Sequence, residues 1–239
     1  ERIGVAKANS EVEQSYLEAC VREELNRTAN RVMAVFDPLK VVLTNYEGSE
    51  ELTVENNPNA EPQTYRQVTF SKELYIDKSD FELVPPPKYY RLKPDGYVRL
   101  KGAYIIRCDE AILDDNGEVK ELRCSVVENS KSGQDVSGVK VKGVIQWVDA
   151  NNCLNVKARK LQSLLTDVKD GVTDFNERFN EQSLKEVDCK TEKSLFSAKA
   201  EDKFQFMRVG YYVMDKDSNG DNLVFNEIVS LKDGFKPSK

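Results

Sequence analysis

Apolar residues recur at helical spacing most clearly near the start of the chain, whereas from residue 31 onward they mostly alternate with polar residues. Between residues 11 and 27 the apolar positions fall on one face of a helix, and the charged positions fall on the other. This pattern predicts an amphipathic helix that packs on a neighbouring element. Its predicted apolar face consists of Val12, Tyr16, Leu17, Cys20, Val21 and Leu25.

Short alternating runs separated by turn signals occupy most of the remaining chain. The candidate strands span residues 32–36, 39–46, 66–76, 89–92, 97–108, 121–127, 141–148, 154–161, 203–215 and 223–231. The turn signals are Asp37-Pro38, Pro94-Asp95-Gly96, Asn116-Gly117 and Asn219-Gly220. Residues 162–203 are more mixed and predict one or two short helices and a loop. The predicted fold class is mostly β, with two β-barrels that follow a helical N-terminal connector.

Length and composition favour a globular protein with two small domains. The chain has 239 residues, of which 39% are hydrophobic and 32% are charged. Its apolar runs fall short of the roughly 20 residues that a membrane-spanning helix needs, so we expect no membrane partner. The sequence begins with neither an initiator Met nor the pattern of a signal peptide, and we therefore expect a fragment or a processed product.

The chain has no histidine and five widely spaced cysteines. The lack of histidine removes Ser-His and Cys-His nucleophile pairs and histidine-ligated zinc, so a self-contained hydrolase is possible but would lack its usual catalytic groups. An odd number of cysteines without a CxxC pair predicts reduced thiols in the cytoplasm.

Two segments approach ligand-binding motifs without completing them. Residues 215–227 come close to a calcium loop, but Asn226 occupies the twelfth position and the flanking residues predict strands. We predict a polar hairpin turn there and no metal. Residues 133–138 begin like a phosphate loop, but Val139 stands where lysine is required. We therefore expect no cofactor in this chain.

Residues 87–106 concentrate cations and tyrosines, although the chain has 41 Asp and Glu against 35 Lys and Arg. Alternation puts Val98 and Leu100 on an apolar face and places Arg99 and Lys101 together on the opposite face. A solvated outer face at a sheet edge would explain one such strand. The combination with tyrosines favours single-stranded RNA, because guanidinium forks read base edges and aromatic rings stack on unpaired bases.

Six segments, in one order and spacing, resemble a single family, the C-terminal anticodon-binding part of the glutaminyl-tRNA synthetases. They span residues 16–46, 68–81, 89–106, 140–148, 203–215 and 223–233, and the resemblance covers residues 1–234. In that family the catalytic half carries HIGH-like and KMSKS-like motifs. The resemblance therefore implies that this chain begins downstream of the active site.

The family's architecture implies a division of the chain into three parts. These are a helical connector at residues 1–28, a discontinuous proximal β-barrel at residues 29–66 and 185–239, and a distal β-barrel at residues 67–184. The barrels would be related to that of a ribosomal protein that binds 5S rRNA. Together they would bind the anticodon loop of glutamine tRNA. The full-length enzyme would be a cytoplasmic monomer whose N-terminal catalytic domain uses ATP and Mg to attach glutamine to tRNA.

Eight residues match positions that contact the anticodon in that family. Those matched to the middle base, a uracil, are Arg31, Gln205 and Arg208. Those matched to the third base, a guanine, are Arg91 and, beside it, Lys88 and Tyr90. Those near the first base are Arg99 and Lys101. Strict alternation along a strand would put Gln205 and Arg208 on opposite faces, so we expect a bulge or twist between them.

The chain departs from the family at three places, and alternatives remain. Asn30 stands where the family often has Pro. Lys101 replaces a frequent Arg, which gives up bidentate geometry, and Gln146 replaces a usual His. One alternative is the anticodon-binding domain of a eukaryote-type glutamyl-tRNA synthetase, which usually lacks the Phe-Gln-Phe of residues 204–206. Others are a non-catalytic rRNA-binding barrel, which needs far fewer residues, and a protein-interaction domain.

Overall fold

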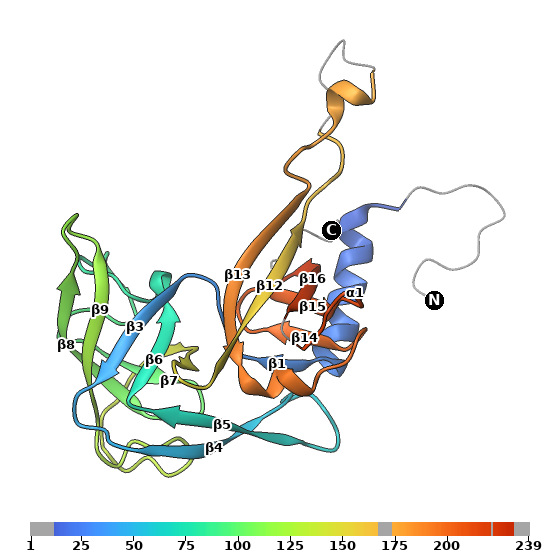
Figure 1. Cartoon of the computed structure of the whole chain (residues 1–239). Coiled ribbons are helices and arrows are strands. Elements are labelled where there is room, and N and C mark those ends of the chain that lie inside the picture. Colours follow the sequence, from blue (N-terminus) through green and yellow to red (C-terminus); the bar gives the residue numbers. More distant parts are fainter. Residues whose placement is uncertain (1–11, 167–173, 221, 232–239) are drawn as a thin grey trace.

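Two seven-stranded, barrel-like sheets make up most of the protein, and a helix and a two-stranded hairpin complete it (Figure 1). The computed structural model describes residues 12–166, 174–220 and 222–231. The predicted fold class, mostly β with two barrel-like sheets and a helix near the N-terminus, is confirmed. The two sheets adjoin where β2 (Ala34–Val35) approaches β6 (Glu73–Asp77) and where β11 (Val148–Asp149) approaches β13 (Leu184–Glu192).

The proximal sheet contains the first and the last strands of the described chain. Its core includes the stacked rings of Phe206 and Tyr212, whose centroids lie 4.4 Å apart. The pairs β1·β14 and β12·β16 are parallel, whereas β14–β15–β16 is an antiparallel meander. In sheet order its strands are β1 (Asn30–Val32), β14 (Lys203–Phe206), β15 (Gly210–Met214), β16 (Leu223–Ser230), β12 (Cys153–Leu161), β13 (Leu184–Glu192) and β2 (Ala34–Val35).

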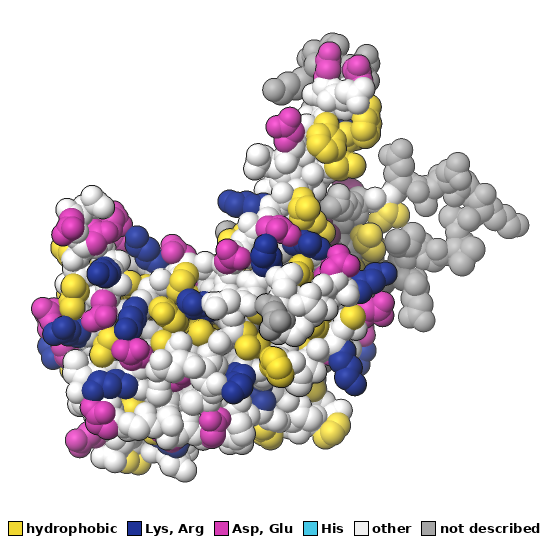
Figure 2. All heavy atoms as spheres, in the orientation of Figure 1, with side chains coloured by type: hydrophobic (Ala, Val, Ile, Leu, Met, Phe, Trp, Pro, Cys, Tyr) yellow, Lys and Arg dark blue, Asp and Glu magenta, His cyan; other side chains and the backbone are white. Residues whose placement is uncertain are grey.

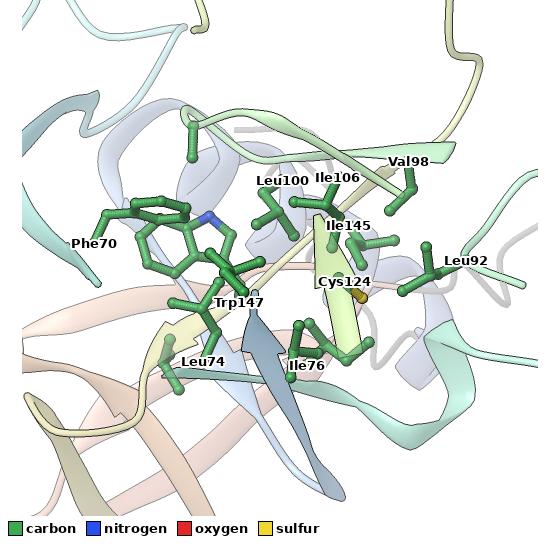
Figure 3. Packing of buried hydrophobic residues seen from close by; sticks show 14 of the residues in the cluster. Phe70, Leu74, Ile76, Leu92, Val98, Leu100, Ile106, Cys124, Ile145 and Trp147 are labelled. Carbon is green, nitrogen blue, oxygen red and sulfur yellow. The ribbon is translucent and has the colours of Figure 1, made fainter. Parts of the chain in front are cut away.

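The distal sheet encloses the larger core, which the hairpin of β4 (Ser49–Glu55) and β5 (Tyr65–Ser71) covers. Trp147 is fully buried in this core, where its ring packs edge-on against Phe70 (Figure 3). The centroids of the two rings lie 5.1 Å apart. The Trp147 indole N–H donates to the carbonyl of Lys101 at 2.9 Å. In sheet order its strands are β10 (Val144–Ile145), β7 (Tyr97–Leu100), β8 (Ile105–Leu113), β9 (Val119–Val126), β3 (Pro38–Leu43), β6 (Glu73–Asp77) and β11 (Val148–Asp149).

Helix α1 (Gln14–Thr28) packs on the proximal sheet through its C-terminal half. Leu25 is buried against Tyr211 and Val229, whereas Leu17 of the predicted apolar face is exposed. The predicted helix is confirmed over these residues, and residues 1–11 of the predicted connector lie outside the described residues. Within the described part of the chain, no helix combines the length and apolar character required to cross a bilayer.

The residues at which the chain crosses from one sheet to the other differ from the predicted domain boundaries. It leaves the proximal sheet after β2, at residues 36–37, and returns between β11 and β12, at residues 150–152. Thus β3, predicted in the proximal barrel, pairs with β9 of the distal sheet, and β12, predicted in the distal barrel, pairs with β16 of the proximal sheet. The physical reason is that each sheet accepts a parallel strand from a distant part of the chain, which local alternation cannot show. The proximal sheet is discontinuous in sequence.

Five predicted strands have a different form in the structure. The runs at residues 66–76, 97–108 and 141–148 are each divided into two strands, which are β5 and β6, β7 and β8, and β10 and β11. Residues 89–92 are irregular and follow Lys88, which has a φ of 62°. The predicted strand at residues 203–215 is divided into β14 and β15 by a turn. Between β12 and β13 a long arm projects from the proximal sheet, and it contains the 3-10 helix η2 (Asn176–Arg178) (Figure 1). The other 3-10 helices are η1 (Lys78–Asp80) and η3 (Lys193–Ser197).

Candidate nucleic-acid interface

Asp80, the last residue of η1, lies at the place where two arginines from opposite sheets meet. Its side chain is fully buried. Arg208 of the proximal sheet donates from Nη1 to Asp80 Oδ2 at 2.8 Å. Arg91 of the distal part places its Nη1 3.3 Å from Asp80 Oδ1 and donates from that atom to the Ser79 carbonyl at 2.9 Å. One buried carboxylate therefore holds two arginines that are 117 residues apart (208 − 91).

The segment that carries Arg91 is fixed by the residue after it. The Leu92 amide donates to the Asp80 carbonyl at 3.0 Å, and the Glu82 amide donates to the Leu92 carbonyl at 3.2 Å. Leu92 is itself fully buried in the distal core. Tyr90, two residues earlier, is half exposed, and the Lys142 ammonium lies 5.1 Å from the centre of its ring. The backbone therefore fixes Arg91 while its side chain reaches the surface.

Arg208 lies in the tight turn between β14 and β15. Phe206 pairs with Gly210, so residues 207–209 form the loop, and Arg208 has a φ of 65°. The Met207 amide donates to the Val32 carbonyl at 3.0 Å, and the Met207 side chain packs against the distal core. The predicted bulge between Gln205 and Arg208 is thus replaced by a turn, because the strand ends at Phe206 and alternation no longer applies.

Arg31 and Gln205 are neighbours on the parallel strands β1 and β14. Gln205 is almost buried and donates from Nε2 to the Tyr211 hydroxyl at 2.7 Å. Arg31 donates from Nη2 to Asn26 Oδ1 at 3.0 Å, whereas its buried Nε has no hydrogen-bond partner among the residues described. The structure brings these two residues together, and within the described ranges no hydrogen bond joins either of them to Arg208.

Arg99 and Lys101 lie on and directly after β7, which neighbours the edge strand β10. Asp80 instead follows β6, which neighbours the opposite edge strand, β11. Arg99 lies on β7 and is partly buried, whereas Lys101 directly follows Leu100, the last residue of that strand. Val98 and Leu100 are buried, so the predicted alternation of buried and outer positions holds along β7 itself. Arg99 pairs with Asp135 and donates from Nη1 to the Ser130 carbonyl at 2.8 Å. Lys101 is exposed.

Hydrogen bonds from the hydroxyl and backbone amide of Ser137 lower the pKa of Asp135, and Arg99 lowers it further. This carboxylate therefore remains charged beside Arg99, and any anion that binds Arg99 must compete with it.

The surface as a whole mixes charges of both signs. Figure 2 shows Lys and Arg side chains interspersed with Asp and Glu on the face in view. As predicted, residues 215–227 contain a hairpin turn: β15 ends at Met214, β16 begins at Leu223, and the two strands pair antiparallel. In the described residues, no cluster of three or more cysteine, histidine, aspartate or glutamate side chains could hold a metal ion. The cations of the candidate site are thus local features of an acidic chain.

The contribution of Asp80 was missed by sequence reasoning. Its only local signal is that an aspartate directly precedes Phe81, an apolar residue that is buried in the core. An aspartate in such a position is usually solvated, and the two arginines that compensate its burial are remote in the sequence.

Comparison with known proteins places these residues in a family. Two family descriptions that both read "tRNA synthetases class I (E and Q), anti-codon binding domain" match residues 29–127 and 144–215. Among similar proteins, glutamine–tRNA ligase of Clostridium perfringens is 49% identical over 98% of this chain, which covers 43% of that relative. The corresponding proteins of Actinobacillus succinogenes and Bradyrhizobium diazoefficiens are 44% and 42% identical, each over 98% of this chain and 42% of the relative. The chain therefore spans less than half the length of these relatives.

Proposed function

The chain belongs to the anticodon-binding family of the class I tRNA synthetases for glutamate and glutamine, and we propose that it recognises the anticodon loop of a glutamine tRNA. The names of the similar proteins support glutamine over glutamate. They do not favour an rRNA-binding barrel or a protein-interaction domain.

The observation that carries this proposal is the open geometry of Arg91 and Arg208. Each guanidinium is held through Nη1 alone, and in the described part of the protein no hydrogen bond uses its Nη2 or Nε. The side chains are 42% and 34% exposed. Two N–H groups of a fixed guanidinium fork match the paired acceptors on a base edge or a phosphate.

The proposed roles follow the positions of the eight residues. Arg91 reads the third base, a guanine, with Lys88 and the exposed ring of Tyr90 beside it. The residues proposed for the middle base, a uracil, are Arg31, Gln205 and Arg208. Those proposed near the first base are Arg99 and Lys101. Arg99 is paired with Asp135, so it binds RNA only by exchanging that partner.

The chemistry of the full-length protein is a further part of the proposal. There, a catalytic domain outside this chain attaches glutamine to tRNA with ATP and Mg, in the cytoplasm and as a monomer. This chain supplies RNA recognition and no cofactor of its own. We expect the isolated chain to bind the anticodon stem-loop weakly and to transfer no glutamine, and an aminoacylation assay of the purified chain tests this.

The substitution Arg91→Lys tests base reading separately from charge. Lysine keeps the positive charge but cannot form the forked pair of hydrogen bonds with guanine. We expect binding to the cognate stem-loop RNA to weaken by about 1–3 kcal/mol, with much less change for RNA that carries adenine at the third base. Fluorescence anisotropy with both RNAs measures the difference.

The control is Lys93→Ala, at an exposed lysine two residues away. Loss of this charge should weaken both RNAs about equally, because it removes a phosphate-attracting charge and no base contact. If Arg91→Lys also weakened both RNAs by one factor, Arg91 would be a phosphate ligand and its assignment to the third base would be wrong.

A further inference from the structure

We propose that Asp80 is a positioning residue that makes Arg91 and Arg208 a single recognition unit, so that the middle and third anticodon bases are read together. The inference rests on the proposed function. It adds a residue that touches no RNA but sets the geometry of two residues that do.

The placement of Asp80 is the first argument. It ends η1, which directly follows β6 of the distal sheet, and Arg208 reaches it from the β14–β15 turn of the proximal sheet. Arg91 reaches it from the irregular segment before Leu92. The carboxylate therefore lies at the junction of three segments that no local sequence pattern connects, and it is the common partner of both arginines.

The burial of Asp80 is the second argument. A fully buried carboxylate is costly unless cations and hydrogen bonds compensate it. Oδ2 accepts the hydrogen bond from Arg208, whereas Oδ1 is buried and, among the described residues, accepts no hydrogen bond, although Arg91 Nη1 lies 3.3 Å away. If either arginine moved away, the buried carboxylate of Asp80 would lose part of the positive charge that compensates its burial. The position of each arginine therefore depends on the other.

The neighbouring acidic group does not replace Asp80. Asp77 also lies at this junction, but its carboxylate accepts hydrogen bonds from Gln146 Nε2 and the Asp37 amide, each at 3.2 Å. Burial raises the pKa of Asp77, and the charge of Asp80 adds to that effect. Asp77 is thus occupied by other partners, and Asp80 is the carboxylate that both arginines share.

The charge of the three-residue unit itself, counted without Asp77, suits RNA. Two guanidinium groups and one carboxylate carry a net charge of +1 (two positive, one negative), and the outward N–H groups of both arginines remain available. Fixing a long side chain before binding reduces the conformational entropy lost on binding. The shared carboxylate therefore preorganises two forks for adjacent bases.

The test is Asp80→Asn, which keeps the shape of the side chain and removes its charge. The probes are four anticodon stem-loop RNAs: cognate, middle-base uracil to cytosine, third-base guanine to adenine, and both. Each altered RNA binds the wild-type chain more weakly than the cognate RNA by some factor. We expect the factor for the doubly altered RNA to be about fivefold smaller than the product of the two single factors, and this ratio is the coupling between the two bases. With Asp80→Asn we expect weaker cognate binding, by about tenfold, and coupling below twofold.

Asp135→Asn is the matched control, because Asp135 pairs with Arg99 rather than with Arg91 or Arg208. Stacking within the RNA can itself couple adjacent bases, and this variant retains that contribution. The coupling should persist in Asp135→Asn. If Asp80→Asn weakens all four RNAs by one factor, Asp80 is only structural and the inference is overturned.

A second cycle covers the case in which Asp80→Asn does not fold. Arg91→Lys, Arg208→Lys and the double variant all retain Asp80, and their losses of cognate affinity should be non-additive by about fivefold. Arg91→Lys combined with Arg99→Lys should be additive, because these arginines share no carboxylate. Additivity in both pairs overturns the inference. A wild-type chain that discriminates at neither base overturns the proposed function as well, which distinguishes the two failures.

Discussion

Arg66 and Arg91 each approach a buried carboxylate near the junction of the two sheets, but the two arginines are held in different ways. Arg66 binds Glu192 through Nε and Nη2, the second contact at 2.8 Å, and donates from Nη1 to the Glu55 carbonyl at 2.9 Å. Arg91 is held through Nη1 only. The Arg66 and Glu192 side chains are 10% and 1% exposed, whereas Arg91 is 42% exposed.

This difference shows what separates a structural ion pair from a recognition site of the same chemistry. In the closed pair, all three guanidinium nitrogens donate hydrogen bonds within the protein and the side chain is largely buried, so Arg66 presents no free fork to a ligand. At Asp80 the carboxylate is equally buried, but its arginines keep part of each fork on the surface. We therefore expect substitutions at the closed pair to change stability with little effect on binding, and substitutions at the open one to change binding as well as stability.

The largest expected effect is that of Glu192→Gln on stability. This change leaves the Arg66 charge buried without its partner and also alters the acceptor for the Met33 amide, which donates to Glu192 Oε2 at 3.0 Å. Removing one partner of a buried ion pair destabilises a protein by about 3–5 kcal/mol. Urea denaturation of both proteins measures this loss, and affinity for RNA at a temperature where both are folded should change less than about twofold.

The matched control lies on the same strand. Glu186 of β13 pairs with Arg159 at 2.8 Å, but both side chains are substantially exposed. Glu186→Gln should reduce the free energy of unfolding far less than Glu192→Gln does, because solvent screens exposed ion pairs. Equal losses at Glu192 and Glu186 would show that burial does not distinguish the two pairs.

The outer face of the candidate site could be predicted from sequence because it depends on strand periodicity alone. Arg99 alternates with Val98 and Leu100, and a period of two fixes its side of β7 wherever that strand pairs, whereas Lys101 follows the end of the strand. The resemblance to known synthetases supplied the remaining candidate residues, which local patterns do not single out. Arg208, for instance, falls inside the predicted strand at residues 203–215, and that alternation does not mark it as a binding residue.

The inner part of the site could not be predicted because it depends on contacts between remote segments. Asp80 and Arg208 are 128 residues apart in the chain, and neither shows in its local pattern that it is paired. The turn at Arg208 was likewise hidden, since residues 203–215 alternate well enough to resemble one strand. The passage of β3 and β12 between sheets has the same origin, because parallel pairing leaves no local signal.

Arg208→Gln gives the second largest expected effect, and it concerns binding. The substitution removes one guanidinium fork from the RNA surface, while Asp80 keeps Arg91 as a partner. We expect affinity for the cognate stem-loop to fall by about 1–3 kcal/mol, and the slope of log K against log salt to decrease in magnitude by about 0.7 if the contact is to a phosphate. Anisotropy titrations at several salt concentrations measure both quantities.

Arg66→Gln is the corresponding change at the closed pair. It removes the same charge from the chain, but from a side chain that is only 10% exposed, so the salt dependence of RNA binding should stay unchanged. If Arg66→Gln and Arg208→Gln altered RNA affinity equally, net charge rather than local geometry would govern binding, and the contrast between the closed and open pairs would not hold.

The smallest expected effect concerns a third carboxylate of intermediate burial, Glu50 on β4. Burial favours its neutral form, but hydrogen bonds from Lys131, Tyr104 and Tyr46 outweigh this, so the pKa of Glu50 lies below its ordinary value of 4.5. A carboxylate with a lowered pKa in the folded state contributes stability that is present above the unfolded pKa and is lost as pH falls through the folded pKa. Glu50→Gln should therefore cost about 1 kcal/mol at pH 7, and the difference from the wild type should shrink below pH 4.5. Urea denaturation between pH 3 and pH 7, with the exposed neighbour Glu51→Gln as control, measures the profile. A difference that stayed constant with pH would mean that packing, rather than the charge of Glu50, stabilises this part of the distal core.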